Sequence, residues 1–372
     1  MMSDEANNTT PVSKLSPLDQ LLEEADSRAW TGVELETPPD LSHINELSEI
    51  LELLNGAEES ETQNTLLGED IILEADFHLV TQIRGHYWQS ITKGVQSKGR
   101  IILLPGFAEF CEKYAPIANV LVTAGYDVLI VDWPGQGRSG HLGKHPLTAH
   151  CDDFEMHRYA VSRLVRETGM DRGVFHVIGH SMGGYFGLHM AHQYPRNIRK
   201  LVLCAPMFLP LSPPIWIVKL LTNMLIGMGR GRHQPPFWGQ PDLKIVSRFK
   251  LNNPLTRDPE SFERPYRVYG HKPELFRVNP SVSWIKTAFD ECTKYSLNPD
   301  WLSEIIADTL LCMPGDERIV DGPATLSMSA HLKECRTVHF HGARHELFAE
   351  LPAVRRRLFA NILTFLNEDN RR

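Results

Sequence analysis

From about residue 71 onward, short apolar runs alternate with helical patterns along the chain. The apolar runs lie at residues 100–105, 127–132, 174–179, 200–204 and 309–313. Runs without polar alternation are typical of strands that are covered on both faces of a sheet. Between and after them, apolar positions at three- and four-residue spacing predict helices over 114–122 and 351–365. The alternation predicts an α/β fold with a mostly parallel sheet, flanked by helices, that binds ligands at the carboxyl ends of its strands.

Two strand-like stretches precede these runs, at residues 75–85 (ADFHLVTQIRG) and 86–91 (HYWQSI). We expect strands in both stretches.

One interval interrupts the alternation. About a hundred residues separate the runs at 200–204 and 309–313, whereas a single crossover helix needs roughly 10 to 30 residues. We predict a core formed by residues 71–206 and 300–372 and an inserted cap, or lid, formed by residues 207–299 over the carboxyl edge of the sheet. The aromatic residues of the cap favour an apolar pocket, or else plain core packing: Trp216, Phe237, Trp238, Phe262, Tyr266 and Trp284.

Charge divides the chain into two unlike parts. The net charge is −8, but residues 1–70 carry 17 acidic and 2 basic residues, so this segment has net −15 and the remainder net +7. Residues 1–70 therefore form an acidic N-terminal extension, in which we expect two short amphipathic helices, at 15–22 and 44–54, on flexible connections. The acidic total excludes a nucleic-acid-binding module, because it supplies no basic field for phosphates.

Six widely spaced cysteines without a CxxC pair indicate a reducing compartment rather than a disulfide framework. The first residues show no secretory signal, and no apolar run reaches the length of a transmembrane helix. We therefore predict a cytoplasmic protein. Ile215–Met228, the longest apolar stretch, is either a buried cap helix or a helix that makes peripheral contact with the inner face of the membrane.

Residues 179–183 (GHSMG) match the G-x-S-x-G pattern of a nucleophile elbow. The stretch follows the strand-like run VFHVIG and opens a helical pattern, which is the strand–turn–helix context that lifts a serine hydroxyl out of a sheet. Ser181 is therefore the predicted nucleophile. The alternative is a glycine turn that carries a passive serine.

A serine nucleophile needs a base, and the base needs an acceptor that orients it. His345 follows the strand-like TVHFH and precedes the final helix, where this fold type places its histidine. Three carboxylates after the strand at 309–313 compete for the third position, and spacing separates them poorly: Asp316, Glu317 and Asp321.

His339 and His341 with His345 form an alternative metal site, which no HExxH pattern or carboxylate partner supports. We therefore predict neither a metal nor a cofactor. Backbone N–H groups of Phe107, just after the strand at 100–105, and of Met182, just after the serine, are the predicted oxyanion hole. For Phe107 the alternative is a plain strand-to-helix turn.

Taken together, the chain resembles the α/β-hydrolase fold, and within it the serine hydrolases grouped as lysophospholipases and monoacylglycerol lipases. The resemblance covers about residues 75–368 and rests on PGFAEFCEKY, DWPGQGRSG, GHSMGG, GDERIVD and GARHELFAE. Within the cap, NPLTRDPESFERPY and SVSWIKTAF are similar to the bacterial lysophospholipase L2 branch.

The resemblance implies Ser181 as nucleophile and His345 as general base. In the family the acid directly precedes an Arg-apolar-apolar-Asp run, which implies Glu317 here, although Asp is the family's more frequent residue. Pro105 also departs from the family, where many relatives carry histidine, and the acidic extension has no family counterpart. The implied function is hydrolysis of a carboxylic ester of a lipid-like substrate through an acyl-enzyme, with lysophospholipid first.

Monoacylglycerol lipase and general carboxylesterase activities are the alternatives, and peptidase, thioesterase and perhydrolase reactions use the same triad. A non-catalytic binding protein that retains the fold is the hypothesis from another class.

Overall fold

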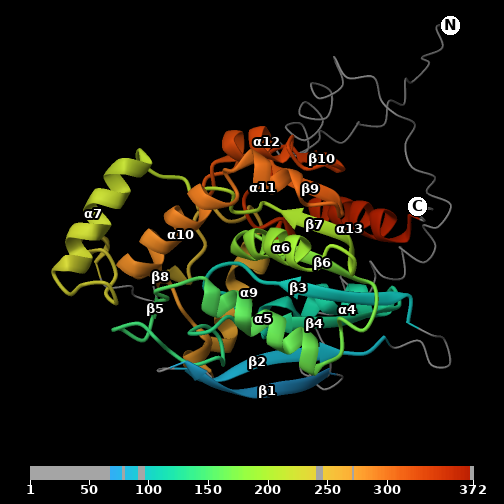
Figure 1. Cartoon of the computed structure of the whole chain (residues 1–372), viewed down its shortest axis with the longest axis horizontal. Coiled ribbons are helices and arrows are strands. Elements are labelled where there is room, and N and C mark those ends of the chain that lie inside the picture. The colour runs from blue at the N-terminus through green and yellow to red at the C-terminus, as the bar shows by residue number, and fades with distance from the viewer. Residues whose placement is uncertain (1–67, 78–79, 91–96, 240–245, 270–271, 369–372) are drawn as a thin grey trace, which may run out of the picture. The chain divides into compact units, whose positions relative to one another are not determined.

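The computed structural model describes residues 68–77, 80–90, 97–239, 246–269 and 272–368. The two helices predicted at 15–22 and 44–54 lie outside the described residues. An eight-stranded sheet is the centre of the described part, in the order β1-β2-β4-β3-β6-β7-β9-β10 (Figure 1). Its strands are β1 (Gly68–Phe77), β2 (Val80–Trp88), β3 (Gly99–Leu104), β4 (Tyr126–Val131), β6 (Phe175–His180), β7 (Ile198–Cys204), β9 (Asp308–Pro314) and β10 (Cys335–Phe340).

From β4 to β10, neighbouring strands are parallel, whereas β1 and β2 pair antiparallel with each other and β2 pairs antiparallel with β4. Each apolar run at 100–105, 127–132, 174–179, 200–204 and 309–313 overlaps one parallel strand within one or two residues. The predicted α/β class with a mostly parallel sheet is confirmed.

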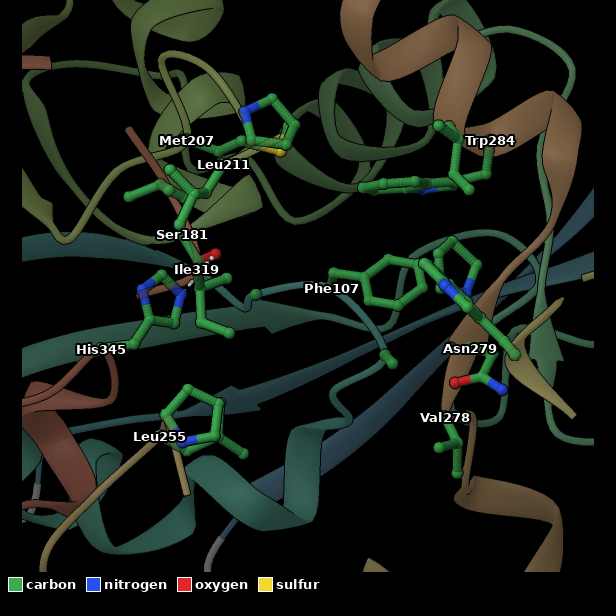
Figure 2. Close-up of a pocket in the computed structure, with 18 of the residues that line it drawn as sticks. Phe107, Ser181, Met207, Leu211, Leu255, Val278, Asn279, Trp284, Ile319 and His345 are labelled. Atoms are coloured by element: carbon green, nitrogen blue, oxygen red, sulfur yellow. Dashed lines mark hydrogen bonds between the residues drawn. The ribbon is translucent and has the colours of Figure 1, made fainter. Parts of the chain in front are cut away.

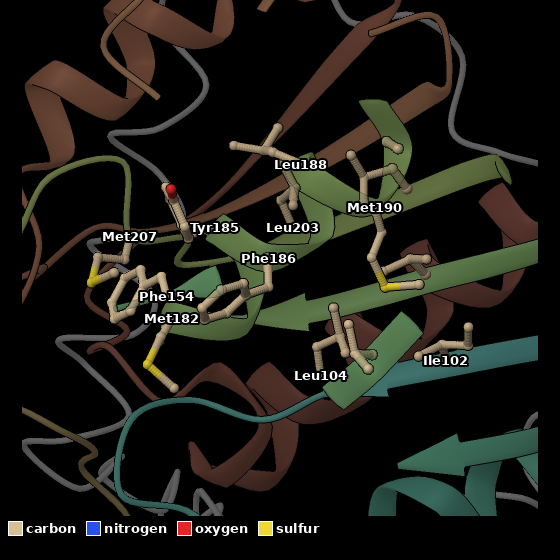
Figure 3. Close-up of a cluster of buried hydrophobic side chains, with 14 of the residues drawn as sticks. Ile102, Leu104, Phe154, Met182, Tyr185, Phe186, Leu188, Met190, Leu203 and Met207 are labelled. Atoms are coloured by element: carbon tan, nitrogen blue, oxygen red, sulfur yellow. The ribbon is translucent and has the colours of Figure 1, made fainter. Parts of the chain in front are cut away.

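Helices cover both faces of the sheet, and side chains that alternate along a strand belong to two separate cores. On β3, Ile102 and Leu104 pack with α5 (Glu155–Glu167) and α6 (Met182–Gln193), in the cluster of Figure 3. Ile101 and Leu103 point the other way and pack with α4 (Ala115–Thr123) and α13 (Pro352–Asn367). This two-sided burial explains why the runs lack polar alternation.

The first hairpin differs from the prediction. The sequence divides 75–91 at Gly85 and His86, but the structure carries β2 through both residues and begins β1 at Gly68, inside the predicted acidic extension. A Cβ at position 85 would lie 3.0 Å from Leu164 Cδ2 and 3.2 Å from Ile130 O. Glycine at position 85 therefore allows β2 to pack closely against α5 and β4, and it does not end the strand.

The segment between β7 and β9 contains most of the remaining helices. These are α7 (Ile215–Gly227), η4 (Pro236–Trp238), α9 (Pro259–Tyr269), η5 (Pro273–Leu275), α10 (Val282–Lys294) and α11 (Pro299–Ser303). Figure 1 shows α7 and α10 side by side, in yellow and orange, beyond one end of the strands. A short two-stranded sheet joins β8 (Asn279–Pro280) of this segment to β5 (Thr148–Ala149) of the core.

The other short elements follow β3, β9 and β10. They are η3 (Cys111–Tyr114), α12 (Gly322–Ser329) and η6 (Leu347–Ala349). None of the six cysteines is in a disulfide, and five of them are buried.

Candidate active site

Ser181 lies at a sharp turn between β6 and α6, with a backbone φ of +52° and ψ of −117°. This conformation is strained for a residue with a side chain, and it is tolerated where the surroundings fix the turn. Neighbouring glycines make the turn fit: a Cβ at position 179 would lie 2.4 Å from Gly183 O, and a Cβ at 183 would lie 2.0 Å from Leu104 O. Close backbone approach therefore requires glycine at both positions.

Three side chains from distant parts of the sequence meet at this turn. His345 Nε2 lies 2.9 Å from Ser181 Oγ, and His345 Nδ1 lies 2.9 Å from each carboxylate oxygen of Glu317. All three side chains are buried. With the proton on Nδ1, His345 donates to Glu317 and its Nε2 accepts from the serine hydroxyl. The geometry can carry a serine proton to a base whose ring is held in one orientation.

Glu317 is also held by the backbone. Its Oε1 accepts from the N–H groups of Ile319, at 2.7 Å, and Val320, at 3.1 Å. Burial raises the pKa of Glu317, but the hydrogen bond and charge of His345 and the two N–H groups outweigh burial and hold the pKa below its ordinary value. The carboxyl group is therefore ionised throughout the neutral range.

The two competing carboxylates have other partners. Asp316 forms a two-point ion pair with Arg318, with both oxygens at 2.7 Å. Asp321 caps the N-terminus of α12, where its side chain accepts from Ala324 N–H. Of the three, Glu317 alone is hydrogen-bonded to His345. The geometry therefore favours the acid that the family resemblance implies.

Hydrogen bonds connect the loop that carries His345 to the inserted segment. Arg344 donates to the carbonyls of Leu251, at 2.7 Å, and Thr256, at 3.1 Å. The N–H of Glu346 donates to Leu255 O at 2.8 Å, and buried Glu350 accepts from Arg344 N–H at 2.8 Å. The sequence analysis missed the contacts with Leu251, Leu255 and Thr256 because they join residues about ninety positions apart.

Phe107 lines the same cavity as Ser181, and Met182 follows Ser181 as the first residue of α6. The N–H groups next to Phe107 are satisfied, since that of Gly106 donates to Glu109 and that of Ala108 to Gln136. Within the described residues, the N–H groups of Phe107 and Met182 donate to no protein acceptor. Unsatisfied N–H groups beside a nucleophile are the arrangement that an oxyanion hole needs, and their role stays a prediction.

A cavity of about 970 Å³ opens at Ser181 and His345, between the strand ends and the inserted segment. Figure 2 shows the serine and histidine facing each other, with Phe107 and Trp284 further along the cavity. The rings of Phe107 and Trp284 pack at 4.3 Å. Five of the six aromatic residues noted in the cap line this cavity; Trp216 does not and is 67% exposed.

His339 and His341 stack with ring centroids 6.5 Å apart, whereas His345 is engaged by Ser181 and Glu317. No group of three metal-ligating side chains occurs within the ranges that the structure describes.

Comparison with known proteins identifies the family. Residues 95–352 match the family model Hydrolase_4, described as serine aminopeptidase, S33. The chain belongs to this family. The serine aminopeptidase S33 family confirms the predicted serine hydrolase class and, with the sheet described above, the α/β-hydrolase fold.

Proteins similar to this chain include a lysophospholipase and two monoacylglycerol lipases. Lysophospholipase L2 of Escherichia coli is 26% identical over 298 residues, which cover 73% of this chain and 81% of that protein. A soluble variant of the monoglyceride lipase of Saccharomyces cerevisiae superposes with a TM-score of 0.64 at 17% identity, covering 81% of this chain and 95% of that one. The monoacylglycerol lipase of Paleococcus ferrophilus gives a TM-score of 0.58 at 22% identity, with 76% and 98% covered.

Proposed function

We propose that this protein hydrolyses the carboxylic ester of a lipid-like substrate, with lysophospholipid as the first substrate class. The observation that carries the proposal is the hydrogen-bonded series from Ser181 through His345 to Glu317 at the floor of a large cavity. The similarity to lysophospholipase L2 supports the substrate class. Monoacylglycerol is the alternative, supported by the structural similarity to two monoacylglycerol lipases.

The reaction proceeds in two halves. Ser181 Oγ attacks the ester carbonyl while His345 Nε2 takes the hydroxyl proton, and the N–H groups of Phe107 and Met182 stabilise the oxyanion. The tetrahedral intermediate then expels the alcohol, which receives the proton from His345. Water, deprotonated by His345, cleaves the acyl-enzyme and releases the fatty acid. Glu317 stabilises the imidazolium that forms in each half.

The charges along the cavity favour a lipid ester over the amino-terminal peptide that the family's description names. A peptide amino group is cationic, so its binding calls for an unengaged carboxylate. The acidic residues that line the described cavity are Glu109 and Glu346, and both are bonded to Lys113. Most of the other lining residues are apolar, as an acyl chain requires.

A fluorophosphonate probe tests the enzyme proposal. We expect the probe to label wild-type protein at Ser181, and we expect Ser181→Ala to lose labelling and at least about a thousandfold in ester turnover, with a melting temperature shifted by no more than roughly 3 °C. Absence of an adduct on folded wild-type protein would favour the non-catalytic binding protein. A panel of lysophospholipids, monoacylglycerols and short p-nitrophenyl esters then ranks the substrate classes by kcat/KM.

We further propose that α7 makes peripheral contact with a lipid surface. The described part of the chain contains no helix long and apolar enough to cross a bilayer. On α7, however, the side chains that line the cavity include Ile217, Val218 and Leu225. Apolar side chains also cover its outer side at four-residue spacing, and each is about half exposed or more: Trp216, Leu220, Met224 and Met228. One apolar side of α7 lines the cavity. The apolar outer side is suited to contact with the apolar part of a lipid surface.

Vesicle sedimentation tests this contact. The double variant Trp216→Ser/Leu220→Ser is expected to lose binding to phospholipid vesicles, because it removes two exposed apolar side chains and leaves the cavity lining intact. Ile72→Ser/Val174→Ser, which removes exposed apolar side chains on β1 and before β6, is the matched control and should bind like wild type. Equal vesicle binding by the α7 variant and wild type would contradict the proposal.

A further inference from the structure

A buried carboxylate lies directly beside the loop that holds the proposed oxyanion donor. Glu109 is 7% exposed, and its Oε2 accepts from the N–H of Gly106 and the hydroxyl of Tyr114. A Cβ at position 106 would lie 2.7 Å from that same oxygen. Glu109 therefore holds the Pro105–Gly106 peptide, one peptide unit before the one that carries the Phe107 N–H, and the Phe107 N–H remains available to a substrate.

A carboxylate in this place is electrostatically unfavourable for the proposed chemistry. The oxyanion that forms at the N–H of Phe107 is negative, and a second negative charge on the buried side chain of Glu109, two residues along the loop, raises the free energy of that oxyanion. A neutral acceptor could orient Gly106 without this cost. The chain must therefore compensate the charge if Glu109 is to serve the loop.

Lys113 supplies the compensating charge. Its ammonium lies 2.5 Å from Glu109 Oε1 and 2.8 Å from Glu346 Oε2, so it joins the oxyanion loop to the residue after His345. Burial acts to raise the pKa of Glu109, but the Lys113 charge and the hydrogen bonds of Lys113 and Tyr114 lower it to about 2. Glu109 is thus always ionised, and always paired, at neutral pH.

We propose that Glu109 is a positioning residue for the oxyanion loop and that Lys113 keeps its charge from opposing the oxyanion. This inference rests on the proposed hydrolase function and assigns the Glu109–Lys113 pair a part in it. The pair orients the Phe107 N–H through Gly106, while the ammonium neutralises the carboxylate that does so.

Other titratable groups lie around the pair, on η3 itself and on four other parts of the chain. Burial lowers the pKa of His180, which is therefore neutral near neutral pH, and burial raises the pKa of Tyr114. The groups that border the small cavity behind the pair are Tyr114 on η3, His180 on β6, Arg264 on α9, Glu346 before η6 and Arg355 on α13. Glu346 is the other acid that loses a partner when Lys113 is removed, so an experiment must separate it from Glu109.

A double-mutant cycle makes that separation, measured as kcat and KM for a soluble p-nitrophenyl ester over a pH series. Lys113→Met should lower kcat by about 10- to 100-fold with KM changed less than about threefold. The loss should grow as pH rises, because unpaired Glu109 is protonated at lower pH and ionises as pH increases. Glu109→Gln, which keeps an acceptor for Gly106, should stay within about threefold of wild type.

The double variant Glu109→Gln/Lys113→Met decides between the two acids. We expect it to recover kcat to within about threefold of Glu109→Gln and to lose the extra decline at alkaline pH. If the double variant is as slow as Lys113→Met, the charge of Glu109 is not what Lys113 compensates and the proposal is overturned. The matched control is Arg336→Met/Glu368→Gln, which removes an ion pair between β10 and the end of α13.

A comparison of two Glu109 variants tests separately whether Glu109 positions the oxyanion loop. This comparison remains possible even if Lys113→Met fails to fold. Glu109→Ala removes the acceptor of Gly106 N–H and should lower kcat at least about tenfold at nearly constant KM, whereas Glu109→Gln should not. Equal kcat in these two variants would overturn the proposal. Fluorophosphonate labelling of wild type at Ser181 alongside that result would leave the hydrolase function intact, so the two failures are distinguishable.

Discussion

At the scale of single residues, the site depends on the direction in which each carboxylate of the GDERIVD stretch points. Asp316 and Glu317 are adjacent, yet the first pairs with Arg318 and the second with His345. Burial separates them as well, since the Glu317 side chain is 6% exposed and that of Asp316 is 34% exposed.

Glu317→Gln is therefore expected to lower kcat by on the order of a hundredfold or more, because the amide no longer stabilises the His345 imidazolium or fixes its tautomer. Asp316→Asn weakens the ion pairs of Asp316 with Arg318 and, at 3.5 Å, with Arg344, but it leaves the hydrogen bond between Glu317 and His345 in place, and kcat should stay within about threefold of wild type. Steady-state kinetics of the two purified variants checks this. A larger loss in the Asp316 variant would reassign the acid.

His157 offers a test of pH-dependent stability. It is fully buried between Phe154, Phe186 and Trp133, and neither ring nitrogen has a hydrogen-bond partner. Burial, and then the charge of Arg158, lower its pKa to about 3. The unfolded chain binds a proton at His157 near its ordinary pKa of about 6.5, whereas the folded chain does not, so this residue destabilises the fold as pH falls from about 6.5 towards 3.

Replacing His157 with Phe removes that proton and keeps an aromatic ring in the stack. We expect the melting temperature of His157→Phe, relative to wild type, to be higher at pH near 5 than at pH near 8, whatever the packing change contributes at both values. Differential scanning calorimetry at the two pH values measures the difference. An identical offset at both would show that His157 does not carry this acid sensitivity.

The residue types of the proposed triad were predictable because the serine and histidine occur at fixed places relative to strands. The acid was not predictable from spacing alone, and only the family resemblance selected Glu317. Glu109 and Lys113 escaped notice although their four-residue spacing is a recognisable pairing signal; what no sequence pattern shows is that the Gly106 N–H lies within reach of Glu109.

At the scale of elements, α10 connects the inserted segment to the core. Glu291 on α10 accepts from Arg158 on α5 at 2.5 Å and from the Tyr185 hydroxyl on α6 at 2.7 Å. About two turns before Glu291 on the same helix, Trp284 packs on Phe107. The position of α10 therefore affects the cavity beside the proposed oxyanion donor.

Glu291→Ala should destabilise the fold by about 3 kcal/mol, because it removes the buried partner of the mostly buried Arg158 guanidinium and leaves only the exposed Glu155, at 3.8 Å. Tyr185→Phe removes one hydrogen bond and should cost only about 1 kcal/mol. Urea denaturation of both variants measures the two values. A smaller effect for Glu291→Ala than for Tyr185→Phe would show that the ion pair does not hold α10.

Element boundaries followed from the sequence where burial was two-sided, as in the parallel strands, and failed where one glycine had a packing role. The two predicted stretches meet at Gly85 and His86, and glycine is unfavourable within strands, but here β2 continues through Gly85 because Leu164 packs where a Cβ would lie. Strand propensity depends on the residue type alone, whereas the packing of Leu164 against Gly85 comes from α5, about eighty positions later in the chain.

At the scale of the whole molecule, charge is distributed along the chain more unevenly than its total suggests. The acidic extension has net −15, against net +7 for residues 71–372. A positive catalytic part is attracted to an anionic lipid surface, and a tethered acidic segment counteracts that attraction at low ionic strength.

Removing residues 1–67 should therefore strengthen sedimentation with vesicles that contain phosphatidylserine at low salt, while binding to neutral phosphatidylcholine vesicles changes little. At high salt the two chains should behave alike on both vesicle types, since charges beyond about 3 Å are screened near 1 M salt. Cosedimentation over a salt series checks both expectations. Weaker anionic-vesicle binding by the shortened chain would show that the extension itself contacts lipid.

The glycines around Ser181 carry a consequence for the tolerance of this chain to change. Positions 179 and 183 leave no room for even a methyl group between β6, α6 and β3. Random mutagenesis should therefore find these two positions among the least permissive in the chain, and substitutions there should lower soluble expression before any loss of catalysis could be measured. A mutant library that is built to broaden the substrate range can therefore keep both glycines and vary residues of the inserted segment instead.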